Sequence, residues 1–130
     1  MVRIDPQQEI FSTIRKAIEE LGYSVYDAGM PPKGTPYPLV YLGYTQQNDT
    51  LTKSQINGTV YQQVDIWHSD ARQRGTVSAM ALAIKRACFA LTHTASFSIG
   101  AKLNDQSIQP DDSSGITLLR CMLEFKITFS

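Results

Sequence analysis

The chain carries its most regular pattern at Leu118-Leu119-Arg120-Cys121-Met122-Leu123-Glu124-Phe125-Lys126-Ile127-Thr128-Phe129. Every odd-numbered residue from 119 to 129 is apolar, whereas half of the even-numbered residues are charged. Successive side chains of a strand point to opposite faces of a sheet. The alternation therefore predicts one long strand whose apolar face packs on helices and whose other face meets water or a polar partner.

A first amphipathic helix is expected from about Pro6 to Leu21. Asp5 is a good N-cap, Pro6 suits the first helical position, and Gly22 follows as a stop. Its apolar residues recur at helical spacing at Ile10, Ile14, Ala17, Ile18 and Leu21. The remaining side chains are mostly polar, so that side of the helix is expected to face solvent.

The second expected helix has the clearest helical periodicity in the chain. Ser69 or Asp70 is expected to cap it, and it should end within residues 92–95. Its apolar stripe repeats at three- and four-residue steps at Val77, Met80, Ala81, Ile84, Ala87, Cys88 and Leu91. Such a stripe predicts a helix that packs against the same core as the last strand.

Four further strands complete the pattern. They are expected at Ser24–Asp27, Leu39–Tyr44, Thr59–Trp67 and around Phe97–Leu103. The stretch Ala28–Pro38 holds four prolines and two glycines, which predicts an ordered but irregular connection. The predicted fold is one α+β domain over residues 1–130, in the order α-β-β-β-α-β-β, with a mostly antiparallel sheet and two helices packed on one face.

A polar stretch joins two of these strands at about residues 46–58. It contains Asn, Asp, Thr, Lys and Gly, and it is too polar for a core and longer than a tight turn requires. We interpret it as the tip of an extended hairpin. Exposed loops of this kind commonly make contacts with partners.

Composition excludes several classes of protein. The 12 Lys+Arg balance the 12 Asp+Glu, which argues against bulk phosphate binding, and the 42% hydrophobic content argues against disorder. No secretory signal and no apolar run of membrane-spanning length is visible, so no membrane partner is expected. Cys88 and Cys121 fit no zinc or redox spacing and lie in apolar patterns, which predicts buried free thiols made in a reducing cytosol.

No catalytic, metal or cofactor site is expected. His68 and Asp70 could be two metal ligands or a base and its orienting group, but a strand end followed by an N-cap explains them too. Asp105, Asp111 and Asp112 could bind a cation weakly, but turn chemistry explains these aspartates equally well. Basic residues cluster only in short pairs, such as Arg72/Arg74 and Lys85/Arg86 of the second helix, so no specific nucleic-acid partner is expected.

One combination of motifs extends over roughly residues 5 to 92. It consists of Tyr26-Asp27, Pro36-Tyr37-Pro38-Leu39-Val40-Tyr41-Leu42-Gly43, Asn48-Asp49-Thr50-Leu51-Thr52-Lys53, Gly58-Thr59-Val60-Tyr61-Gln62-Gln63-Val64-Asp65-Ile66-Trp67 and a helix that opens with Asp70-Ala71-Arg72. In this combination the chain resembles the tail-terminator, or tail-to-head joining, proteins of long-tailed (siphovirus-type) bacteriophages and prophages of Gram-positive bacteria. The C-terminal third agrees only in its general α+β character.

The resemblance implies a structural role without catalysis. Members of that family form a homo-oligomeric ring, commonly a hexamer, which caps the tail tube, ends its polymerisation and offers a docking face to the head. The implied partners are the major tail tube protein and a head-completion or connector protein. The implied location is the head–tail interface of the virion tail, after synthesis in the bacterial host cytoplasm.

The resemblance also points to individual residues. Asp49, Thr52 and Lys53 match the family's hairpin and are the candidates for protein contacts, with Tyr37 at the entry to its strand. Trp67 also matches and is a candidate for a subunit contact, because aromatic residues are enriched at interfaces. Alternative functions are another head–tail connector, a minor tail component, or a domain that binds nucleic acid or a small molecule on the polar face of its sheet.

Overall fold

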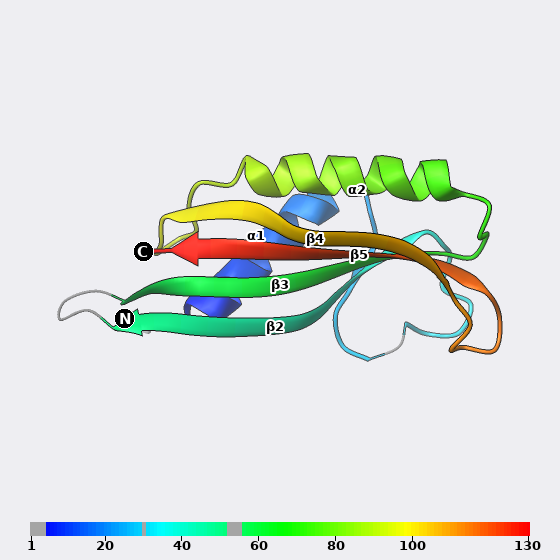
Figure 1. Cartoon of the computed structure of the whole chain (residues 1–130), viewed down its shortest axis with the longest axis horizontal. Helices are drawn as coiled ribbons and strands as arrows, with labels where there is room; N and C mark the ends of the chain where they lie inside the picture. Colours follow the sequence, from blue (N-terminus) through cyan, green and yellow to red (C-terminus); the bar gives the residue numbers. More distant parts are fainter. Residues whose placement is uncertain (1–4, 30, 52–55) are drawn as a thin grey trace.

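A computed structural model describes residues 5–29, 31–51 and 56–130 (Figure 1). Its elements are α1 (Pro6–Glu20), β1 (Val25–Tyr26), β2 (Leu39–Leu51), β3 (Ile56–His68), α2 (Arg74–Phe89), β4 (Ile99–Asp111) and β5 (Leu118–Phe129). The predicted α+β class and the predicted order of elements are confirmed.

The five strands form one sheet in the order β1-β2-β3-β5-β4. Only the short β1 runs parallel to its neighbour β2, and all other pairs are antiparallel. The central pair β3–β5 has no register break, from Gly58 opposite Phe129 to His68 opposite Leu119. The two flanking pairs each contain a β-bulge, one in β2 between Leu42 and Thr45 and one in β4 after Leu103.

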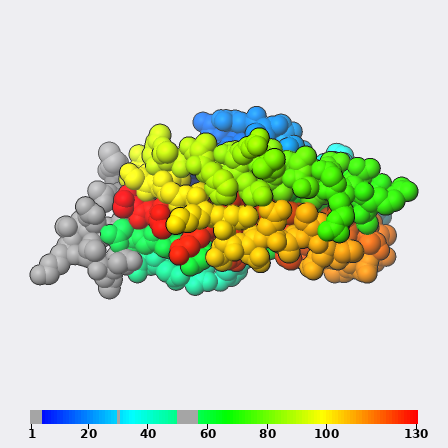
Figure 2. Space-filling view, turned by 45° about the horizontal axis from the view of Figure 1, so that its top comes forward, coloured from blue at the N-terminus to red at the C-terminus, as the bar shows by residue number. Residues whose placement is uncertain are grey.

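One hydrophobic core joins both helices to the sheet. The alternation of β5 is confirmed, because its buried apolar positions are Leu119, Cys121, Leu123, Phe125, Ile127 and Phe129. Helix α1 contributes Ile10, Ile14 and Ile18, and α2 contributes Val77, Met80, Ala81, Ile84 and Cys88. Figure 2 shows α2 and β4 side by side on one surface of the molecule, and the two elements are in contact.

A buried carboxylate fastens α1 to the loop after α2. Glu9 is 7% exposed, and its Oε1 accepts hydrogen bonds from Thr94 Oγ1 at 2.8 Å and from Ser96 N at 2.9 Å. Burial acts to raise the pKa of Glu9, but the hydrogen bonds from Thr94 and Ser96 outweigh it and lower the pKa below its ordinary value. The folded state therefore favours the ionised carboxylate.

Replacing Glu9 by alanine is expected to cost about 1–3 kcal/mol at neutral pH, because two donors lose a charged acceptor. A group whose pKa is lowered by folding stabilises the protein above its ordinary pKa and loses that effect in acid. The difference between wild type and Glu9→Ala should therefore shrink as the pH falls through about 4. Urea unfolding across that pH range measures it. Glu19→Ala, on the exposed side of the same helix, is the control and should change little.

The helix boundaries differ from the prediction at α2. The helix starts at Arg74 with Gln73 as its N-cap, so the prediction of Ser69 or Asp70 was wrong. The Asp70 carboxylate instead accepts from the backbone N of Arg72, which holds a separate turn before the helix. The helix ends at Phe89, before the predicted 92–95, and Ala90 is its C-cap, with its backbone N donating to the carbonyl of Arg86.

Several strands are longer than predicted. β2 continues to Leu51 and β3 begins at Ile56, so most of the polar stretch 46–58 is paired strand rather than a loop. β4 likewise runs on to Asp111, well beyond the predicted end at Leu103. Pro110 is compatible with β4 because that strand lies at the edge of the sheet.

Gly58 allows the close approach of β2 and β3. A Cβ atom at this position would lie 2.2 Å from the Asn48 carbonyl oxygen and 2.9 Å from the Asp49 Cα. Both neighbours are backbone atoms, which cannot move aside as a flexible side chain can. The polar end of the hairpin therefore depends on a residue without a side chain.

Gly58→Ala is expected to lower the free energy of unfolding by about 2 kcal/mol or more, since the added methyl group forces the two backbones apart. Gly75→Ala is the matched control, because a Cβ there meets nothing within 4 Å. Gly75 lies in α2, where alanine is favoured over glycine by about 0.5–1 kcal/mol. Urea unfolding should show opposite signs for the two variants, and equal effects would contradict the steric argument.

Candidate functional site

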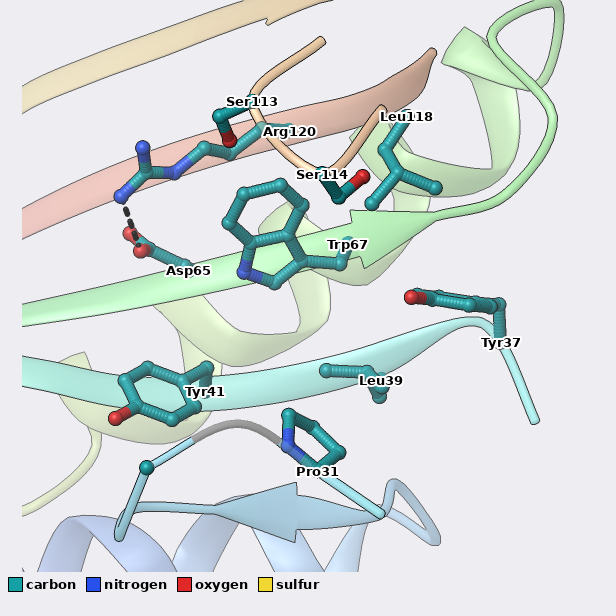
Figure 3. Close-up of a pocket in the computed structure, with 11 residues that line it drawn as sticks. Pro31, Tyr37, Leu39, Tyr41, Asp65, Trp67, Ser113, Ser114, Leu118 and Arg120 are labelled. Atoms are coloured by element: carbon teal, nitrogen blue, oxygen red, sulfur yellow. Dashed lines mark hydrogen bonds and ion pairs between the residues drawn. The ribbon is translucent and has the colours of Figure 1, made fainter. Parts of the chain in front are cut away.

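A cavity of about 310 Å³ lies on the face of the sheet that the core does not use (Figure 3). It is lined by Gly29, Pro31, Tyr37, Leu39, Tyr41, Asp65, Trp67, Ser113, Ser114, Leu118 and Arg120. The strand residues among them alternate with core residues such as Val40, Ile66 and Leu119. The side walls come from the irregular connection 28–38 and from the loop between β4 and β5.

The register of the sheet brings the floor of the cavity together. Leu39 of β2 lies opposite Trp67 of β3, and Trp67 lies opposite Arg120 of β5. In a neighbouring row Tyr41 lies opposite Asp65. Residues far apart in sequence therefore form one surface, on which Figure 3 shows Trp67 between the Arg120 side chain and Leu39.

An ion pair closes one end of the cavity. Arg120 Nη2 donates to Asp65 Oδ2 at 2.8 Å, and the Asp65 side chain is only 4% exposed. Gln63 Nε2 donates to the other Asp65 oxygen at 2.9 Å. The Arg120 guanidinium carbon also lies 4.8 Å from the centre of the Trp67 ring, within range of a cation–π interaction.

A second carboxylate approaches the same guanidinium. Asp111 Oδ2 lies 3.5 Å from Arg120 Nη1. Hydrogen bonds from the side chain and backbone of Ser113 lower the pKa of Asp111, and Arg120 adds to that effect. Arg120 Nε is buried and has no hydrogen-bond partner among the described residues. The cluster thus fixes Arg120 beside Trp67.

The rest of the cavity is apolar and aromatic. Pro31, Leu39 and Leu118 combine with the rings of Tyr37, Tyr41 and Trp67. Tyr37 is 39% exposed and stands at the opening. Aromatic residues and arginine are enriched at protein interfaces, and apolar cavities of this size with a few polar groups also bind small molecules.

The structure brings together two of the five predicted site residues, Tyr37 and Trp67. Asp49 lies far along β2, opposite Gly58, where its Oδ1 accepts from Gln47 Nε2 at 2.8 Å. Thr52 and Lys53 lie outside the described residues. The prediction of a contact site that includes Asp49, Thr52 and Lys53 therefore stays a prediction.

Sequence reasoning missed the contribution of Arg120 and of the loop at Ser113 and Ser114. One feature of the sequence could have identified Arg120 as a site residue. It is a charged residue on the non-core face of a strongly alternating strand. The loop gave no such signal, since serines and aspartates are ordinary turn residues.

The other groups considered for chemistry have structural partners. His68 Nδ1 accepts from the backbone N of Asp70, and Asp70 pairs with Arg72. Cys88 and Cys121 are free and buried, as predicted, and burial raises their pKa to about 12 and about 11. Among the residues that the structure describes, no three His, Cys, Asp or Glu side chains are grouped as metal ligands would be. No helix within those residues is long and apolar enough to cross a membrane.

Comparison with solved structures finds a similar fold. No protein-family model matches the chain, and neither does any curated protein. The chain is similar to a solved chain described as "Virion of native gene transfer agent (GTA) particle". The two share 19% sequence identity with a TM-score of 0.73, over 95% of this chain and 93% of the other. The two chains therefore share a fold over nearly their whole lengths.

Proposed function

We propose that this chain is a structural protein of a tailed phage or phage-like virion, and that it acts as a tail terminator at the head–tail joint. In this role it caps the tail tube, ends polymerisation of the tube and provides the surface on which the head connector docks. The observation that carries the proposal is the fold shared almost end to end with a chain from a gene transfer agent virion. The motif combination over residues 5 to 92 supports the more specific role.

The proposed role needs no catalysis and no cofactor. The charged groups of the cavity contact one another, because Arg120 is held by Asp65, Asp111 and the Trp67 ring. Its partners are other copies of the chain in a ring, proposed as a hexamer, together with the major tail tube protein and a head connector. These partners are protein surfaces, which suits a chain without a net charge.

The cavity is the proposed docking point for one of these partners. Its size suits a single large apolar or aromatic side chain, and its opening is flanked by Tyr37. A partner's aromatic side chain that becomes buried in such a cavity contributes a large share of the binding energy at a protein interface. The cavity and the polar end of the hairpin lie at opposite ends of β2, so the two can contact different partners.

Deletion and complementation in the virus that encodes the chain test the proposal. Without the chain, electron microscopy should show tails of abnormal length that carry no heads, and the wild-type chain should restore normal particles. Complementation with Tyr37→Ala should restore normal tail length or head attachment less well than the wild-type chain, because Tyr37 flanks the opening of the proposed docking cavity. Tyr44→Ala is the matched control, because Tyr44 is 62% exposed and does not line the cavity.

The length of the tails separates the alternatives. Tails of normal length without heads would favour a different connector protein over a terminator. Normal particles in the absence of the chain would contradict every structural role at the head–tail joint.

A further inference from the structure

Both edges of the sheet contain open stretches. β1 pairs with β2 only at Val40 and Tyr41, so beyond these residues the outer side of β2 meets no further strand in the described ranges. β4 forms the opposite edge and is exposed beside α2 in Figure 2. An edge strand presents a row of backbone N–H and C=O groups, and a further strand is the structure that satisfies such a row.

The regular parts of the two open edges lie in the same rows of the sheet. Across the strands, Asp49 is in line with Ile99, and Thr45 is in line with Leu103. Both edges become irregular at the next row, where β2 and β4 each have a bulge. Thr45–Asp49 and Ile99–Leu103 are therefore two straight stretches in the same rows, without proline or bulges. The backbone N of Ile99 already donates to the Thr92 carbonyl at 2.9 Å, so the open part of the β4 edge is Ala101–Leu103.

The topology gives these two stretches opposite directions. β2 is antiparallel to β3, β3 to β5, and β5 to β4, so β2 and β4 run in opposite directions. A second copy placed beside the first by rotation about an axis along the strands would present its β2 antiparallel to β4. That contact joins different surfaces of the two copies and can repeat until a ring closes.

The charges do not oppose this arrangement. Asp49 is the only charged residue in Thr45–Asp49, and Lys102 is the only one in Ile99–Leu103. In unshifted register Asp49 lies opposite Ile99 and Lys102 lies opposite Gln46, so no like charges face each other across the contact. The balanced total of 12 cations and 12 anions adds no long-range repulsion between copies.

We infer that Thr45–Gln47 of β2 pairs with Ala101–Leu103 of β4 in a second copy of this chain, antiparallel and in unshifted register. This contact supplies the subunit interface of the ring, and its biological setting rests on the proposed function. In this register Gln46 lies beside Lys102 of the neighbouring copy, on the face of the sheet away from the core.

Disulfide cross-linking tests the contact in the full-length chain. Directly opposed residues on paired strands have Cβ atoms about 4.5–5.5 Å apart, which is close to disulfide geometry. Within one copy, positions 46 and 102 are separated by three strand spacings, roughly 14 Å, so they cannot form a bond with each other. The double variant Gln46→Cys/Lys102→Cys should give a ladder of covalent oligomers on mild oxidation, and reduction should abolish it.

Three controls define the contact. Wild type should not cross-link, because Cys88 and Cys121 are buried. The single variants Gln46→Cys and Lys102→Cys should stay monomeric when oxidised alone and form a dimer when mixed. The pair Ser12→Cys/Ser78→Cys places two exposed thiols on the helices and should give no ladder.

Each outcome decides the inference. Oxidation is carried out on the free chain at high concentration and on the chain mixed with isolated tail tubes. Absence of a ladder in both, or dimers from either single variant alone, would overturn the edge contact. Tube capping by the wild-type chain is measured separately, so capping without a ladder overturns only this contact. A ladder without capping overturns only the proposed function.

Discussion

Arg120→Met is expected to lower the free energy of unfolding by about 3–5 kcal/mol, because it leaves the Asp65 carboxylate buried without a cation. Asp65 would keep one hydrogen bond, from Gln63, at a side chain that is 4% exposed. Methionine fills a volume similar to that of the arginine stem, so lost packing is a minor part of the effect. Urea unfolding followed by circular dichroism measures the change.

Substitution of the other partner of this ion pair should lower the free energy of unfolding by a smaller amount. Asp65→Asn removes one charge from a guanidinium that is 26% exposed and still has Asp111 at 3.5 Å. We therefore expect a loss of about 1–3 kcal/mol, the range for an imperfectly replaced hydrogen bond to a charged group. Asp65→Asn/Arg120→Met should recover much of the loss seen in Arg120→Met, since no buried charge remains.

The fluorescence of Trp67 reports on the position of the Arg120 side chain. Trp67 is the only tryptophan in the chain, and the guanidinium carbon lies 4.8 Å from its ring centre. Arg120→Met should therefore shift its emission, with the folded state verified independently by circular dichroism. An unchanged spectrum and a stability loss below about 1 kcal/mol, the value typical of exposed pairs, would show that the ion pair is solvated.

Phe125→Ala is expected to destabilise the fold by about 3–5 kcal/mol, the range observed when a buried aromatic side chain is truncated. Phe125 is fully buried on β5, and its ring meets that of Phe89 edge to face with centroids 6.2 Å apart. The substitution therefore leaves a cavity between the sheet and α2 and removes an aromatic pair.

Phe89→Ala is the matched control for this core position. Phe89 takes part in the same aromatic pair but is 47% exposed. Phe89→Ala removes the aromatic pair and part of the buried apolar area, but it leaves no closed cavity. We therefore expect the free energy of unfolding to fall by about 1–2 kcal/mol. Equal losses for Phe89→Ala and Phe125→Ala in urea unfolding would contradict the placement of Phe125 at the centre of the core.

The elements that could be predicted from sequence are those whose pattern is local. The alternation of β5 and the stripe that includes Val77, Met80 and Ile84 are periodic, because one side of each element is buried. The end of β2 was missed because its residues from Gln46 to Asp49 are all polar. In that stretch pairing with β3 and the missing side chain of Gly58, rather than hydrophobic alternation, determine the structure.

The candidate site was only partly accessible to sequence reasoning. Tyr37 and Trp67 were predicted, but their place in one cavity depends on the register of three strands and on two loops. The pairing of Asp65 with Arg120 joins residues 55 positions apart. Nothing in local periodicity specifies such a pair, because the register arises only when the sheet forms.

The same register underlies the proposed role in the virion. It places the cavity at one end of the sheet and the straight stretches of the two edges at the other. A partner can therefore occupy the cavity while neighbouring copies pair along the edges. This division suits a protein that must bind its own copies and a different protein at the same time.

Electron microscopy of tail tubes that polymerise in the presence and absence of the purified chain tests the proposed role in one measurement. The chain is expected to add a ring at one end of each tube and to stop further growth from that end, so that tubes become shorter as its concentration rises. Tubes with unchanged ends and unchanged lengths at every concentration would contradict a tail-terminator function.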